Sequence, residues 1–343
     1  MTQVPAQFLN AEASSSFRDG IQYAWSASTI KLAETCLRKY QYEMLEGWHG
    51  RGKNVHLRFG GHYATALEHF HKRRAEGQSY DEAMRTVVLE ALTDTWDYDE
   101  CDICKGSGLV GDGIAEHQFV CVGCSGTGNL PSGQPWVSDH NFKTRETLIR
   151  TIVWYLEHFR DEPALPIILE DGAPAVELSV LLPVDNGVVF SAHLDRLADY
   201  ADNTYVVDQK TTGSTLSANY FNQYSPDSQM SMYTFLGKAA FGLPVKGVLI
   251  DAAQIAVGFT RFERGVTMRT EGQLNEWYDH TLTLIERARR ATAERNLPMN
   301  PSACGNFGGC AFRAVCSRDP AARLQFLKAD FIQGGVYDPL EKR

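Results

Sequence analysis

The sequence predicts an α+β (mixed α/β) fold, and three observations lead to it. Apolar residues recur at helical spacing through most of residues 28–159. Between residues 176 and 210 the period changes to two, which is typical of half-buried strands. A helix, a strand and a long helix are expected to follow. Strands grouped between helical segments favour an α+β arrangement.

Local signals justify the elements in order. Ser28 is the expected N-cap of the first helix, and the pair Gly60-Gly61 precedes the second. Turn sequences at 185–187 and 202–203 separate three strands, which should form a meander. The expected helices cover about 28–40, 62–75, 81–96, 142–159, 226–241 and 271–295, and the expected strands cover 176–182, 189–197, 205–210 and 245–255.

The length of 343 residues suggests about two domains, and composition subdivides the chain further. Glycines and four cysteines interrupt the helical pattern, and three more cysteines follow the last helix. We expect a flexible tail at 1–22, a helical region at 23–100, a cysteine-rich insertion at 101–128, a main core at 129–300 and a cysteine-rich C-terminal region at 301–343.

Composition and charge bound the class of protein. With 43% hydrophobic and 22% charged residues, the chain is an ordinary globular one. It has no run of about 18 apolar residues and no secretory leader, so we expect a cytoplasmic protein with no membrane contact. In that reducing compartment, the eight cysteines are better interpreted as metal ligands than as disulfides. The net charge of −9 argues against histone-like binding of nucleic acid, but not against an enzyme with an acidic metal site.

Carboxylates and a lysine are expected to converge on the meander. Asp208 and Lys210 are two residues apart on one strand and therefore share a face. Asp195 on the preceding strand can lie beside Asp208, and Glu177 on the first strand offers a third carboxylate. Such oxygen ligands suit Mg²⁺ or Mn²⁺, and a lysine nearby can stabilise charge growing on a phosphoryl oxygen. A single D-x-K sequence is more often a surface ion pair, so the context of these residues carries the hypothesis.

Two C-x-x-C pairs, separated by sixteen residues, predict a tetrahedral zinc site. The ligands are Cys101, Cys104, Cys121 and Cys124. Each pair is followed by x-G-x-G, and the segment resembles half of the cysteine-rich region of DnaJ-type chaperones. We favour a structural finger. Contact of its tip with DNA or a partner is the alternative.

The order of the motifs resembles the PD-(D/E)xK nuclease superfamily, specifically its RecB-like branch, which includes CRISPR-associated iron–sulfur exonucleases. The resemblance rests on a short element ending at Asp195, in which Ser191 replaces the usual glycine, and on Asp208-Gln209-Lys210. Gln229-x-x-x-Tyr233 follows at the expected separation, and Ser26-x-Ser28 precedes Cys36. The match covers most of residues 23–320, without the insertion.

The resemblance implies a restriction-endonuclease-like αβββαβ core and roles for individual residues. Asp195 and Asp208 would bind metal, Lys210 would assist catalysis, and Glu177 matches less closely as a further acidic ligand. Gln229 and Tyr233 would contact DNA near the site.

A metal-binding histidine, usual in the family four residues after a glycine, is replaced here by Ala64, counted from Gly60. His62 and His193 are speculative substitutes, and for each of them a structural role is favoured.

The resemblance also implies a [4Fe–4S] cluster. Three thiolates, Cys304, Cys310 and Cys316, would bind it together with Cys36 near the N-terminus. A Zn²⁺ ion on the same ligands is the competing assignment. The cluster would join the ends of the chain, and a redox role is less favoured.

We therefore expect a metal-dependent DNA exonuclease that acts on single-stranded or resected DNA in replication, recombination or repair, as in phage-like systems. Because no Walker A sequence is present, helicase activity would need a helicase or recombination partner. The alternative is a nuclease-like module that has lost catalysis and binds DNA or a partner, which Ala64 favours. A third hypothesis is an electron carrier.

Basic residues such as Lys143, Arg145 and Arg150 are expected either to be solvated on a helical face or to line a DNA groove.

Overall fold

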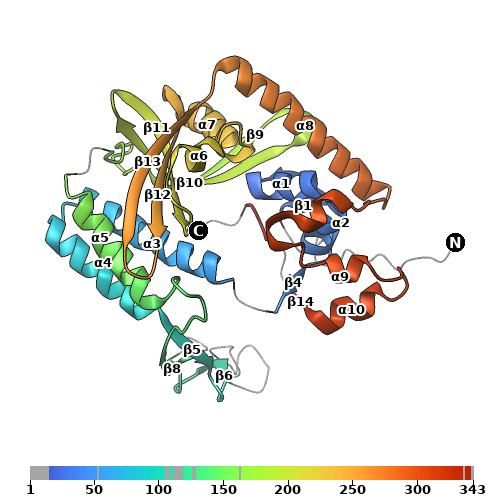
Figure 1. Cartoon of the computed structure of the whole chain (residues 1–343), viewed down its shortest axis with the longest axis horizontal. Coiled ribbons are helices and arrows are strands. Elements are labelled where there is room, and N and C mark those ends of the chain that lie inside the picture. The colour runs from blue at the N-terminus through green and yellow to red at the C-terminus, as the bar shows by residue number, and fades with distance from the viewer. Residues whose placement is uncertain are drawn as a thin grey trace.

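A mixed β-sheet lies between two layers of helices in the computed structural model (Figure 1). The structure describes residues 15–51, 54–104, 109–110, 119–125, 129–161, 164–334 and 337–340. The strand order is β13-β12-β11-β10-β3, and β9 also pairs with β10. These strands are β3 (Ala24–Trp25), β9 (Val176–Pro183), β10 (Val189–Tyr200), β11 (Asn203–Thr212), β12 (Val245–Ile255) and β13 (Thr260–Met268).

The predicted meander and the strand after it are confirmed. β9, β10 and β11 pair antiparallel in succession, whereas β12 pairs parallel to β11. α7 (Ser228–Phe241) connects β11 to β12, as a parallel pair requires. The edge strand β13 was not predicted, because its exposed polar residues hide the period of two. The strands and helices together confirm the predicted mixed α/β architecture.

The two helical layers bury separate cores. α1 (Ala27–Thr35), α7 and α8 (Glu271–Ala293) cover one face of the sheet. α3 (Val55–Ala75), α4 (Tyr80–Asp94) and α5 (Arg145–His158) cover the other. Along β12, Ile250 and Ala252 belong to the first core, while Ala253 and Ile255 belong to the second. Successive side chains of β12 project to opposite faces of the sheet, so this one strand contributes to both cores. Among the described residues, no helix has the length and apolar character needed to cross a membrane.

A third core joins the two ends of the chain. β4 pairs antiparallel with β14, although the two strands come from opposite ends of the sequence, and Tyr42 packs against Phe312. This region contains α2 (Leu37–Tyr40), a π-helical turn (Gln41–Leu45), β4 (Trp48–Gly50), a 3-10 helix (Pro301–Gly308), α9 (Arg313–Cys316), α10 (Arg323–Asp330) and β14 (Phe331–Gln333). The remaining elements are β1 (Phe17–Arg18), β2 (Ile21–Gln22), α6 (Ala218–Asn222), and in the insertion the pairs β5 (Trp96–Glu100) with β8 (Asn129–Pro135) and β6 (Leu109–Val110) with β7 (Phe119–Val120).

Two helix starts differ from the expectation. Ser26, not Ser28, caps the first helix, because Ser26 and Thr29 form a reciprocal capping box. The second long helix begins at Val55 rather than His62, because Asn54 accepts hydrogen bonds from the first-turn amides. Gly60 and Gly61 therefore lie inside this helix.

The expected flexible tail is ordered from residue 15. β1 and β2 form a short hairpin, Phe17 is buried, and the Gln22 carboxamide accepts a hydrogen bond from Tyr40. Residues 1–14 of the expected tail lie outside the described residues. The expectation of a loose segment up to residue 22 was therefore wrong for the hairpin.

A buried charge network supports the second face of the sheet. Asp251 Oδ2 accepts hydrogen bonds from Tyr155 at 2.5 Å, from Arg264 at 3.0 Å and from Arg196 at 3.4 Å. Arg196 is 0% exposed, and it also contacts the buried His71. Because two guanidinium groups share one carboxylate away from water, removing that carboxylate takes away the negative charge that faces both of them.

We expect Asp251→Asn to lower the free energy of unfolding by about 3 kcal/mol, because it removes the carboxylate charge that two buried arginines share. Tyr155→Phe, which removes one hydrogen bond from the same oxygen, should cost about 1 kcal/mol. Urea denaturation of the three proteins measures both changes. An equal, small loss in the two variants would contradict the network's role.

Candidate metal and catalytic site

Asp195 and Asp208 lie where the pairing of two central strands ends. The register of β10 with β11 runs from Tyr200↔Asn203 to Arg196↔Val207. Asp195 and Asp208 are the next residues on each strand. Beyond that point the Gln209 amide donates to Asp195 Oδ2 at 2.7 Å. At this position the Asp195 carboxylate accepts the hydrogen bond that a backbone carbonyl of β10 would otherwise accept.

Lys210 forms an ion pair with Asp208. Its ammonium lies 2.8 Å from Oδ1 and 2.6 Å from Oδ2, and Asp208 is 3% exposed. Burial alone would lower the pKa of Lys210, but Asp208, Tyr233 and Asp195 raise it further than burial lowers it. Lys210 is therefore a cation at neutral pH.

The two carboxylates are destabilised in their ionised form. Burial and the charge of Asp208 raise the pKa of Asp195 to about 7, although the Gln209 amide and Lys210 oppose the shift. Burial also raises the pKa of Asp208 against the opposing effect of Lys210. One lysine does not compensate for the buried Asp208 and the half-buried Asp195, which leaves a place for a further cation.

A small cavity beside Asp195 is lined by further side chains that carry oxygen atoms, and by Arg196 and His71. Glu177 from β9, Gln209 from β11 and Glu68 from α3 line it. Glu177 has a left-handed backbone (φ 52°), which is unusual for a residue with a Cβ and is common at functional sites. Gln209 Oε1 is buried and has no hydrogen-bond partner among the described residues.

Ala64 lines this cavity, as expected for the position of the missing histidine. Sequence analysis missed Glu68, although it follows Ala64 by one helical turn and so shares its face. The two histidines considered as substitutes lie elsewhere. His62 packs near Trp136, and His193 hydrogen-bonds Ser179 at 3.0 Å.

The α7 residues singled out from the sequence also reach the site. Gln229 donates to the Tyr233 hydroxyl at 2.9 Å. Burial and then the charges of Asp208 and Asp195 raise the pKa of Tyr233. Tyr233 therefore remains a neutral hydroxyl group close to both carboxylates.

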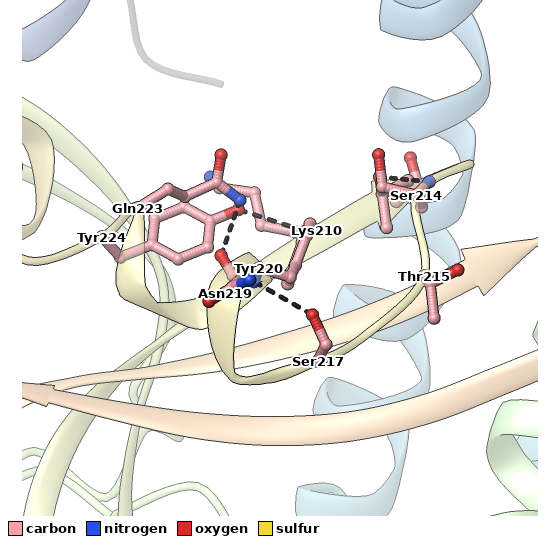
Figure 2. A pocket seen from close by; sticks show the side chains of 10 residues that line it. Lys210, Ser214, Thr215, Ser217, Asn219, Tyr220, Gln223 and Tyr224 are labelled. Carbon is pink, nitrogen blue, oxygen red and sulfur yellow. Dashed lines mark hydrogen bonds between the residues drawn. The ribbon is translucent and has the colours of Figure 1, made fainter.

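A polar hollow of about 510 Å³ begins at Lys210 (Figure 2). Tyr220 and Tyr224 line it, and their hydroxyls are 3.1 Å apart. Phe221 points away and packs on Gly265 of β13, where a side chain would clash. Two of the three aromatic residues after β11 are thus available to a ligand near Lys210.

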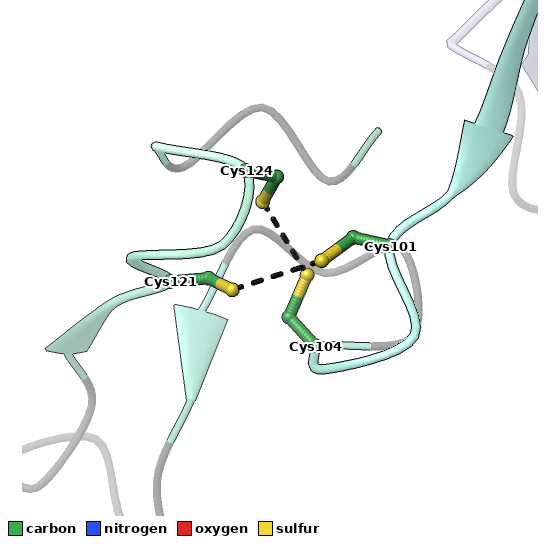
Figure 3. A group of neighbouring side chains, drawn as sticks. All are labelled: Cys101, Cys104, Cys121 and Cys124. Atoms are coloured by element: carbon green, nitrogen blue, oxygen red, sulfur yellow. Dashed lines mark hydrogen bonds between the residues drawn. The ribbon is translucent and has the colours of Figure 1, made fainter. Parts of the chain in front are cut away.

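Four cysteines of the insertion form a compact buried group (Figure 3). Their sulfur atoms lie within 4.8 Å of one another, with 3.8 Å between Cys101 and Cys121 and 3.6 Å between Cys104 and Cys124. Disulfide sulfurs would be about 2.05 Å apart. A tetrahedron with Zn–S bonds of about 2.3 Å has edges of about 3.8 Å. The spacing therefore suits a single tetrahedral ion.

The other four cysteines lie where the chain ends meet. Cys36 interrupts the first helix with an extended backbone (φ −166°), and its sulfur accepts the Asn300 amide at 3.3 Å. The Cys304 thiol faces the Asn300 carbonyl at 3.8 Å. Burial raises the pKa of Cys316, Arg323 and Arg38 lower it, and the Cys310 and Cys36 thiols raise it. The structure thus brings the N-terminal cysteine to the C-terminal set.

A comparison of the whole fold found a crystal structure from Eubacterium rectale of a protein named "putative exonuclease". It is 10% identical, the alignment covers 90% of this chain and 92% of that one, and the TM-score is 0.45. No curated protein matches this chain. The family model of the PD-(D/E)XK nuclease superfamily matches residues 24–317, a span that contains both carboxylates and Lys210. The chain therefore belongs to the PD-(D/E)XK nuclease superfamily.

Proposed function

We propose that this protein is a divalent-metal-dependent DNA exonuclease, of the RecB-like branch of its superfamily. The observation that carries the proposal is the meeting of Asp195, Asp208 and Lys210 at the end of the β10–β11 pairing. Superfamily membership supports phosphodiester hydrolysis. The metal, the DNA substrate and the exonuclease mode are the finer parts of the proposal.

The donor set fits Mg²⁺ or Mn²⁺. Hard cations take oxygen ligands, and Asp195 and Asp208 supply two carboxylates whose burial favours a cation between them. Glu177 and the orphaned Gln209 carbonyl line a small cavity together with Asp195 and Arg196. Glu68 is a further carboxylate on the helical face of Ala64, where the family's histidine would stand. When bound, the ion would lower the pKa of an attacking water.

Lys210 would interact with the phosphate of the substrate as well as with the metal ligand Asp208. Its protonated ammonium, held by Asp208, can stabilise negative charge that grows on a phosphoryl oxygen. Gln229 and Tyr233 would contact the DNA beside it, since the Tyr233 hydroxyl stays neutral near the carboxylates. Tyr220 and Tyr224 could stack on unpaired bases in the hollow, which favours single-stranded or resected ends.

The insertion would hold Zn²⁺ as a structural finger. The four buried thiols match the edges of a zinc tetrahedron. The proposed ligands are Cys101, Cys104, Cys121 and Cys124.

A [4Fe–4S] cluster would connect the chain ends. Cys36 reaches the C-terminal thiols across the third core, and Arg38 and Arg323 place positive charge beside Cys316. Among the described residues these thiols do not gather within 4.8 Å as the insertion thiols do. A cluster of several atoms needs wider spacing than a single ion. The proposed ligands are Cys36, Cys304, Cys310 and Cys316.

A nuclease-like binding module is the second candidate, and the replacement of the usual histidine by Ala64 favours it. In that case the protein would bind DNA, or a helicase or recombination partner, without cutting. Activity assays separate the two candidates.

Wild-type protein, purified without oxygen, should degrade end-labelled DNA with Mn²⁺, whereas Lys210→Met should lose about 100-fold or more of the rate. The physical reason is the loss of the cation that faces the phosphate. Lys246→Met is the matched control, because Lys246 is exposed at the opposite end of the same sheet. Cleavage products resolved on denaturing gels measure the rates.

Equal rates in the two lysine variants would contradict the assigned site. A folded wild type that binds DNA without cutting would support the binding module instead.

Cys101→Ser should lose about one equivalent of zinc and keep its iron, because only the insertion ligands change. Cys310→Ser should lose iron and the visible absorbance of the cluster while keeping zinc. Elemental analysis with absorbance spectra of the anaerobic proteins measures both. Zinc in place of iron at the second site would overturn the cluster assignment.

A further inference from the structure

Lys143 is a buried cation that has no carboxylate partner among the residues that the structure describes. It is 3% exposed, and no salt bridge among the described residues includes it. Its ammonium donates one long hydrogen bond, 3.4 Å, to Thr211 Oγ1 and lies 5.5 Å from the centre of the Phe59 ring. An ammonium has three N–H donors, so this contact satisfies only part of its capacity. Burial accordingly lowers the pKa of Lys143.

The surroundings of Lys143 favour negative charge. Lys143 directly precedes Thr144, the N-cap of α5, and α3 begins nearby at Val55. The exposed His56, in the first turn of α3, has its ring 5.0 Å from that of His140. His140 in turn accepts the Lys143 amide at 3.1 Å. Two helix N-termini, each with positive partial charge, thus begin close to an ammonium that has no carboxylate partner in the described part of the chain.

Thr211 connects this place to the candidate catalytic strand. Thr211 follows Lys210 on β11, and both residues line the hollow of about 510 Å³ (Figure 2). Gly60 of α3 lies next to the Thr211 hydroxyl. A Cβ atom placed on Gly60 would be 3.7 Å from Thr211 Oγ1, which is an ordinary van der Waals distance. Thr211 thus links the hollow, which it lines, to the Lys143 ammonium, which its hydroxyl contacts at 3.4 Å.

Other basic residues of this segment have structural partners. Arg145 donates to the Thr95 hydroxyl and the Leu92 carbonyl, both at 2.9 Å. Arg150 donates to backbone carbonyls of the β12–β13 turn. Each of these arginines therefore makes at least two hydrogen bonds to neutral acceptors, whereas the Lys143 ammonium makes one, of 3.4 Å, among the described residues.

We propose that Lys143, Thr211 and His56 form a phosphate-binding subsite that holds the DNA backbone next to the scissile phosphodiester. The Thr211 hydroxyl and the Lys143 ammonium would donate to the phosphate oxygens, and His56 would border the subsite on its solvent side. The inference rests on the proposed function, since it assigns the path of the DNA away from Lys210. A purely structural strut between α5 and β11 is the competing role of Lys143.

Binding of a 20-nucleotide fluorescein-labelled single strand tests the subsite, with Asp208→Asn in every protein to prevent cleavage. Lys143→Met should weaken binding about tenfold, because it removes a charge-assisted contact. It should also reduce the slope of log affinity against log salt by about 0.7, the value for one phosphate on a single strand. Fluorescence anisotropy across a salt series measures both quantities. Lys246→Met, which removes an equal charge far away, should leave both unchanged.

The structural role and the phosphate-binding role of Lys143 predict different cleavage rates for the Lys143 variant at saturating DNA. In the otherwise wild-type enzyme, Lys143→Met should keep the single-turnover rate within threefold once the DNA is saturating. A lower saturated rate with unchanged affinity would mean that Lys143 positions β11, and would overturn the subsite. Equal affinity and salt slope for the Lys143 and Lys246 variants would overturn it as well.

Two further results keep the test decisive. If Lys143→Met does not fold, His56→Gln on the exposed side should weaken binding by about two- to threefold, and an unchanged affinity would overturn the subsite. If the Asp208→Asn parent binds no DNA, the subsite is overturned, while cleavage by the wild type still judges the proposed function separately.

Discussion

Two carboxylates that lie side by side, the buried Asp208 and the half-buried Asp195, are the constraint on which the centre of this structure depends. Desolvation and the charge of Asp208 raise the pKa of Asp195 to about 7, while the Gln209 backbone amide and Lys210 act against this shift. Residues that follow each other on a strand project to opposite sides. Arg196, next to Asp195, accordingly enters the buried network of Asp251 behind the sheet. The site and its support are thus built from neighbouring residues of β10.

The meeting of Asp195, Asp208 and Lys210 could be predicted from the sequence because the information for it is local. The period of two places Asp208 and Lys210 on one face, and the turns between strands place Asp195 beside them. The C-x-x-C spacing similarly predicted the compact thiol group of the insertion. By contrast, the helix starts were displaced, because the capping side chains of Ser26 and Asn54 compete with other polar residues nearby.

Residues whose roles depend on tertiary packing could not be predicted. Glu68 becomes notable only when α3 covers β9 and β11, although its spacing from Ala64 was a usable signal. Lys143 was interpreted as a solvated helical residue or part of a DNA groove, but the meeting of α3, α5 and the end of β11 buries it. Cys36 reaches the distant C-terminal region because the helix breaks at that residue and β4 pairs with β14. No pattern within a short window encodes such contacts.

Titration of Mn²⁺ into the anaerobic protein, followed by calorimetry, tests the central claim most directly, since it needs no DNA and no turnover. The account predicts that the wild type binds Mn²⁺, that Asp195→Asn loses at least about tenfold in affinity, and that Glu68→Gln loses less. Asp199→Asn, a change of the same kind further along β10, should bind as the wild type does. Equal Mn²⁺ affinity in the Asp195 and Asp199 variants would contradict the account, because the paired carboxylates would then not be the metal site.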